Sequence, residues 1–183
     1  MQTRSRQLTL SAMFTALGVL FPIVFHSLGL GSTFLPMFWP IAAAAYFLAA
    51  PMAAAAAIVS PLLSSLLTGM PPISPPILHV MMLELIVLVL TIRLFFAKWR
   101  RGALVSLAAG LAVSRFTLYL IILIAAPLLG LPATVFSVAM VARGAPGIIG
   151  MLIFLPIAVA RIKRVHYWPP KKAHVASTSK LFQ

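Results

Sequence analysis

Few side chains in this sequence can take part in polar chemistry. Glu84 is the single acidic residue among 183, and the chain has no cysteine. Metal-dependent hydrolysis, aspartyl proteolysis and glycoside hydrolysis each need several carboxylates or a set of Cys and His ligands. Thiol chemistry and disulfides need cysteine. We therefore expect no metal site and no enzymatic activity, since no serine is spaced as a nucleophile beside a histidine base.

The carboxylate and one histidine share the segment HVMMLEL. Glu84 lies about 10 Å inside the apolar stretch that begins at Ile77, at 1.5 Å rise per helical residue. A carboxylate at that depth in lipid costs several kcal/mol unless it is paired, solvated or protonated. It is therefore either a contact in a water-accessible pocket or part of a structural hydrogen bond between helices. His79 lies on another part of the helix circumference, as a ligand contact or as an interfacial histidine.

Two arginines are further candidates. Arg115 falls near the middle of an apolar stretch and has three possible partners: Glu84, an anionic ligand group, or the inner headgroup region reached by snorkelling. Measured from the outer ends of their stretches, Arg115 and Glu84 differ in depth by about 10 Å. Arg143 precedes Pro146 and the last apolar stretch. There it either helps a helix N-terminus to receive an anion or is a simple interfacial arginine.

The composition requires a lipid environment for these residues. Hydrophobic residues make up 62% of the chain and charged residues 8%, with a mean hydropathy of +1.11. Soluble domains have about a quarter of their residues charged, and a membrane span takes about 20 apolar residues. We expect an all-α integral membrane protein in which residues 1–164 form a six-transmembrane-helix bundle and 165–183 a basic, polar tail. The expected spans are 8–28, 34–49, 52–67, 77–96, 103–129 and 146–160.

The positive charges indicate the orientation of this bundle. Most of the 14 Lys and Arg residues lie in the N-terminus, the 97–102 loop and the C-terminal tail. Cytoplasmic loops carry the excess of positive charge, so both termini are predicted to be cytoplasmic. The net charge of +13 is therefore interpreted as a topology signal rather than as a nucleic-acid-binding surface. Residues 131–143 are either an interfacial segment or a short helix.

Two further motifs stand out. The loop TGMPPISPP, residues 68–76, contains Met70 and is stiff and uncharged. It suits either the wall or gate of a pocket or a tight crossover between spans. Ala12 and Ala16 are four residues apart on the first helix. Such a pair allows close approach of another helix, from a partner membrane protein or from the same bundle.

Several segments occur together in one order: LTLSAMFTALGVLFP, FLPMFWPIA, LLTGMPPISPP with MMLEL, and GAPGIIGMLIFLPIAVARIKR. Over residues 4–164 they resemble the S components of energy-coupling-factor (ECF) vitamin transporters. The TGMPP loop with Met81–Leu85 is the most specific part. The resemblance implies a six-helix, multi-pass bundle in the bacterial cytoplasmic (inner) membrane that binds a vitamin near its outer face. It also implies docking to a transmembrane coupling protein that carries two ATPase subunits.

The resemblance assigns roles to residues of this chain. Ala12 and Ala16 become the docking face, and the loops near 26–36 and 68–76 become candidate gates. Many such proteins have a His after the Pro-Met of the second span, whereas Phe38 and Trp39 follow Met37 here, so aromatic stacking is expected instead. The candidate substrate contacts are Glu84, His79, Arg143, Arg115, Trp39 and Met70.

No Walker motif occurs in the chain, so ATP is expected to be hydrolysed by the partner subunits and this chain to hold no cofactor. The pocket would suit a cobalamin, folate, pantothenate or pyrimidine-like ligand. Two other functions are compatible with the residues. One is a small transporter that works without ATPases, and the other is a structural subunit of a membrane complex.

Overall fold

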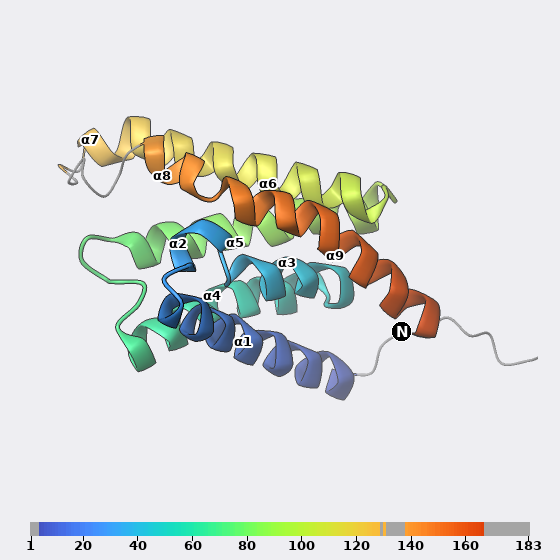
Figure 1. The fold of residues 1–183 in the computed structure, drawn as a ribbon. Coiled ribbons are helices and arrows are strands. Elements are labelled where there is room, and N and C mark those ends of the chain that lie inside the picture. The colour runs from blue at the N-terminus through green and yellow to red at the C-terminus, as the bar shows by residue number, and fades with distance from the viewer. Residues whose placement is uncertain (1–3, 129, 131–137, 167–183) are drawn as a thin grey trace, which may run out of the picture.

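The structure is a computed structural model that describes residues 4–128, 130 and 138–166 (Figure 1). Within these ranges the chain is helical and has no strand. π-Helical turns continue two of the helices: η1 (Leu94–Lys98) follows α5 and η2 (Ile121–Ala125) follows α6. The helices in order are α1 (Arg4–Ser27), α2 (Gly31–Phe34), α3 (Phe38–Phe47), α4 (Ala50–Thr68), α5 (Ile77–Arg93), α6 (Ala103–Leu120), α7 (Ala126–Leu128), α8 (Val138–Arg143) and α9 (Ala145–His166).

Five helical segments of the described chain are long and apolar enough to cross a membrane. This confirms the prediction of an all-α, multi-pass membrane protein. Each lies on one of the predicted spans, and α9 continues beyond the predicted end at residue 160. The segments are Arg4–Ser27, Ala50–Thr68, Ile77–Lys98, Ala103–Ile124 and Ala145–Ile162.

The predicted second span, residues 34–49, is not one helix. Leu35 adopts a left-handed conformation with φ 49°, and Pro36 follows it, so α2 ends there and α3 begins only at Phe38. The 10 residues of α3 are about 15 Å long, half of the bilayer hydrocarbon core of about 30 Å. The prediction was therefore wrong about the length of this helix.

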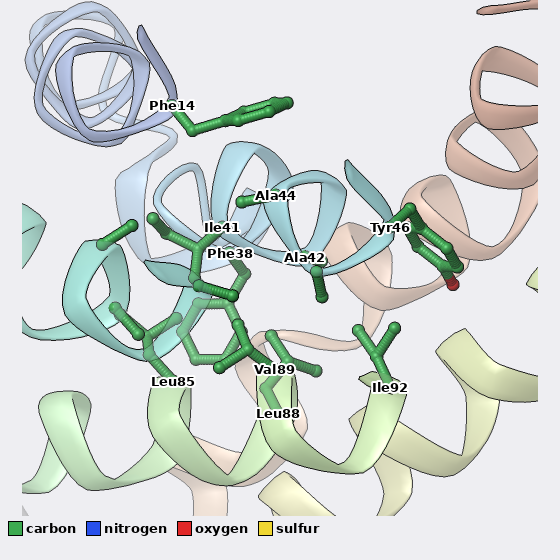
Figure 2. Close-up of a cluster of buried hydrophobic side chains, with 14 of the residues drawn as sticks. Phe14, Phe38, Ile41, Ala42, Ala44, Tyr46, Leu85, Leu88, Val89 and Ile92 are labelled. Carbon is green, nitrogen blue, oxygen red and sulfur yellow. The ribbon is translucent and has the colours of Figure 1, made fainter. Parts of the chain in front are cut away.

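This short helix nevertheless lies at the centre of the bundle. It packs against α1, α4, α5 and α9, and Ile41 has no exposed surface. Figure 2 shows side chains of α5, among them Leu88 and Ile92, directed at one side of α3, with Phe14 of α1 on another side. Small residues in FWPIAAAAYF let the surrounding helices approach closely.

The end of α3 is joined to the start of α1. The Gln7 amide Nε2 donates to the Phe47 carbonyl (3.3 Å), and its Oε1 accepts from the Ala49 amide (2.8 Å). The chain between α1 and α4 thus returns to the level at which α1 begins. Tyr46 donates its hydroxyl to the Ala103 carbonyl (2.8 Å) and so also ties α3 to the start of α6.

The two ends of the bundle are formed by different helices. In Figure 1 the start of α1 and the end of α9 lie at the same end, whereas α2, α7 and α8 lie at the opposite end. The uncertain segment 131–143 includes a short helix, α8, while 131–137 lie outside the described residues. The expected tail 165–183 lies outside them as well, apart from its first two residues.

Candidate functional site

A cavity of about 420 Å³ opens into the bundle at the end opposite the start of α1 and the end of α9. The last turns of α1, the α2 segment, the loop after α4 and the first turns of α5 surround it. The short α3 leaves this space open. Its C-terminal end lies at the level of Gln7, near the start of α1, and its 10 residues extend through only about half the length of the bundle. The volume lies within the range of about 300–1,000 Å³ that is typical of small-molecule sites.

Most of the cavity wall is apolar, and prolines and methionines make up more than half of its apolar residues. Four prolines supply rigid surface without backbone N–H groups, and three methionines supply flexible, polarizable surface that adapts to a ligand. These residues are Pro22, Pro36, Pro71, Pro72, Met37, Met70 and Met81. The predicted proline loop thus contributes to the wall, whereas its role as a gate stays a prediction.

Hydrogen bonds hold this loop to the end of α4. The Met70 carbonyl accepts from the Ser64 hydroxyl (2.8 Å) and from the Thr68 hydroxyl (3.3 Å). The Met70 amide in turn donates to the Thr68 oxygen (3.2 Å). Gly69 ends α4 with φ 72°, a conformation that glycine adopts without strain. The position of Met70 in the wall is therefore determined by polar groups of α4.

An ion pair lies at the bottom of the cavity. Arg115 Nη2 of α6 is 2.5 Å from Glu84 Oε1 of α5, and the two side chains are only 11% and 6% exposed. The Arg115 guanidinium also lies over the Phe38 ring, 4.7 Å from its centroid. We call Phe38, Glu84 and Arg115 the floor of the cavity. Of the three partners considered for Arg115 in the sequence, Glu84 is the one it contacts.

The sequence-based estimate placed Glu84 and Arg115 at different depths, because it measured each depth from the predicted outer end of its apolar stretch. The turn that joins η1 to α6 puts the end of η1 and the start of α6 at one level. Counted from Lys98, Glu84 is about 21 Å along its helix, and counted from Ala103, Arg115 is about 18 Å along the next. The two residues therefore lie at similar depths, and the helices that carry them pack closely together.

Polar side chains also lie nearer the mouth. Arg143, at the end of α8, lines the cavity and is exposed. Glu84, the single acidic residue of the sequence, is paired with Arg115, so Arg143 has no acidic side chain to pair with. His26, in the last turn of α1, lines it too, and its ring occupies the space beside Gly31 where a Cβ would lie. Sequence reasoning did not single out His26, because its contact with Gly31 depends on the fold of α2 over α1.

Two predicted substrate contacts lie elsewhere. His79 is exposed and does not line the cavity, because it is on another face of α5 than Val80 and Glu84. Trp39 is turned towards α9: its Nε1 donates to the Phe34 carbonyl (2.9 Å), and its ring lies 6.5 Å from that of Phe154. The structure thus brings Glu84, Arg115, Arg143 and Met70 to one cavity.

The predicted docking residues occupy the outside of the bundle. Ala12 and Ala16 of α1 are both exposed, so neither packs between helices in the part of the chain that the structure describes. Across the same residues, no group of three or more His, Cys, Asp or Glu side chains could hold a metal ion. Comparison of the chain with protein-family models, with curated proteins and with solved structures found no match.

Proposed function

We propose that this chain is the substrate-capture subunit of an ATP-driven, ECF-type importer of a vitamin or vitamin precursor. The observation that carries the proposal is the cavity at one end of an all-helical membrane bundle, with a buried ion pair at its floor. Few precisely placed polar groups in a mostly apolar pocket are typical of small-molecule binding sites. The sequence resemblance supplies the transporter class.

In this proposal the chain crosses the membrane six times and both termini are cytoplasmic. The α2–α3 segment makes the second crossing, with the short helix in the inner half and the cavity wall in the outer half. The cavity then faces the outside, where a scarce nutrient is captured. The exposed Ala12 and Ala16 face the coupling protein, which carries two ATPase subunits.

The same geometry disfavours a transporter that works alone. Below the floor, Ile41, Leu88 and Ile92 have no exposed surface, so the inner half of the described bundle has a packed apolar core in place of a polar path. Purified protein in liposomes should therefore bind substrate without sustained uptake. A structural subunit, the other alternative, would need no ligand cavity.

Ligand binding is tested by thermal unfolding of the purified protein with a panel of water-soluble vitamins and their precursors. A ligand at 100 times its dissociation constant stabilises the native state by about 2.7 kcal/mol. We expect one chemical class in the panel to raise the unfolding temperature. If a well-folded sample responds to no compound, the structural-subunit alternative is favoured.

Coupling is tested with substitutions of Ala12 and Ala16 by leucine. We expect ATP-driven uptake to fall while ligand binding is retained, because bulky side chains prevent close helix approach. Ala108 and Ala112 of α6 provide a matched control, since they have the same spacing and are also exposed. Equal uptake by both double variants would contradict the docking role.

A further inference from the structure

The floor of the cavity contains an ion pair, whose two residues both line the cavity, and one further donor that the described chain leaves without a partner. Glu84 Oε1 and Arg115 Nη2 lie against each other at 2.5 Å, whereas the buried Arg115 Nε makes no hydrogen bond within the described residues. A buried ion pair offsets its loss of hydration only when its remaining donors and acceptors are also satisfied. Within the described residues, the hydrogen bonding of the floor is therefore incomplete.

Packing holds these atoms in one arrangement. Phe38 is 1% exposed, and its ring supports the Arg115 guanidinium from one side. Glu84 as a whole residue is 4% exposed, and its neighbour Leu85 has no exposed surface. A ligand that enters the cavity thus meets a guanidinium beside a carboxylate, two groups whose charges sum to zero.

This arrangement discriminates between ligand head groups by charge. A carboxylate would satisfy Arg115 but stand next to the Glu84 carboxylate, and an ammonium would satisfy Glu84 but stand next to Arg115. At such distances in a site of low polarity, like charges repel strongly. A neutral group that presents an N–H beside a C=O satisfies both residues at once and preserves their ion pair.

We infer that the cavity floor recognises a neutral donor–acceptor head group, such as a carboxamide, lactam, ureido or pyrimidinone edge. The inference rests on the proposed function and deepens it by naming the substrate class. The apolar wall takes the body of the ligand. Any anionic group on the ligand would lie at the mouth beside Arg143, away from the floor.

The absence of cysteine from the chain allows a direct test. Met81→Cys places a single thiol in the cavity wall, and its rate of reaction with a small thiol reagent reports occupancy. The probes are benzamide, benzoate and benzylammonium, which share one ring and differ in the head group. Leu66→Cys, on an exposed position of α4 outside the cavity, controls for effects of the probes on the reagent.

We expect benzamide to halve the labelling rate of Met81→Cys at a concentration about tenfold lower than either charged probe, a difference of about 1.4 kcal/mol. In addition, Glu84→Gln leaves the floor cationic and should shift the preference to benzoate. Arg115→Gln leaves it anionic and should shift the preference to benzylammonium. If either variant fails to fold, the comparison of the three probes on Met81→Cys alone tests the preference for a neutral head group.

The inference is overturned if benzamide gives no protection, or if a charged probe protects Met81→Cys as well as benzamide does. The proposed function fails by a different result, namely that no vitamin of the panel stabilises the protein. A vitamin that binds without any preference for the amide probe would therefore remove the head-group class and leave the capture function in place.

Discussion

At the scale of single residues, Phe38 has a contact that the sequence did not predict. The sequence predicted aromatic stacking against a ligand in place of a histidine contact. In the structure the Phe38 ring lines the cavity and lies against the Arg115 guanidinium, at 4.7 Å from ring centroid to guanidinium carbon, while stacking on a ligand stays a prediction. A cation over an aromatic face contributes about 2 kcal/mol or more when both are removed from water. Phe38 thus positions the cation of the floor.

Replacement of Phe38 by leucine should remove this support while retaining an apolar side chain. We expect the free energy of unfolding to fall by about 2 kcal/mol and the ligand affinity to fall with it. Phe14→Leu is the control, because Phe14 is also buried and stacks on Phe47, away from the cavity. Thermal unfolding and ligand titration measure the two effects. Equal losses of affinity in both variants would contradict the positioning role of Phe38.

Arg143 provides a second prediction at this scale. It is exposed and lines the cavity without an acidic partner, so Arg143→Gln should leave the unfolding temperature unchanged. We expect it to weaken the binding of anionic ligands and to reduce the salt dependence of that binding, because exposed charges are screened by ions. Arg101→Gln, at the opposite end of α6 from the cavity, is the control. Titration at two ionic strengths is the measurement, and unchanged binding of an anionic ligand would exclude the contact.

At the scale of secondary-structure elements, the cavity depends on the contact between α2 and α9. Gly147 makes this contact possible, because a Cβ there would lie 2.5 Å from the Phe34 carbonyl oxygen. The clash involves backbone atoms, so a side chain cannot relieve it by rotation. The glycine therefore determines how closely α2 approaches α9, and with it the position of the cavity wall.

Gly147→Ala should destabilise the protein by about 1–3 kcal/mol, as overpacking of a close contact does. This loss is expected even though alanine has the higher helix propensity by about 1 kcal/mol. Gly102→Ala is the matched control, since a Cβ at Gly102 meets nothing within 4 Å. Thermal unfolding with and without ligand tests both variants. A Gly147→Ala protein as stable as the Gly102→Ala protein would show that α2 can shift at no cost.

At the scale of the whole molecule, the orientation of the bundle decides which side the cavity serves. Ser32 and Ser74 are exposed at the cavity end, and Arg101 is exposed at the other end. Cysteines at Ser32 and Ser74 should react with an impermeant thiol reagent applied to intact cells, and a cysteine at Arg101 should react only after lysis. The reverse labelling pattern would place the cavity in the cytoplasm and exclude nutrient capture from outside.

The positions of the helices follow from local properties of the chain. Backbone groups in lipid must be satisfied within each segment, so a long apolar run has to be a helix wherever it packs. The apolar runs therefore predicted the five long helices. The single acid in the chain likewise limited the possible ion pairs to those of Glu84. The glycine and prolines of TGMPPISPP located the loop between α4 and α5, because their effect on the backbone is local.

Other features depend on how the helices pack, and the sequence alone did not determine them. The left-handed conformation of Leu35 leaves α3 short, and the burial of α3 among four helices is a contact pattern that a hydropathy pattern does not record. The pairing of Glu84 with Arg115, the turn of Trp39 towards α9 and the inclusion of His26 in the cavity all depend on helix level and rotation. Residues far apart in the chain set these quantities together, so only the tertiary structure decides which polar side chains share one cavity.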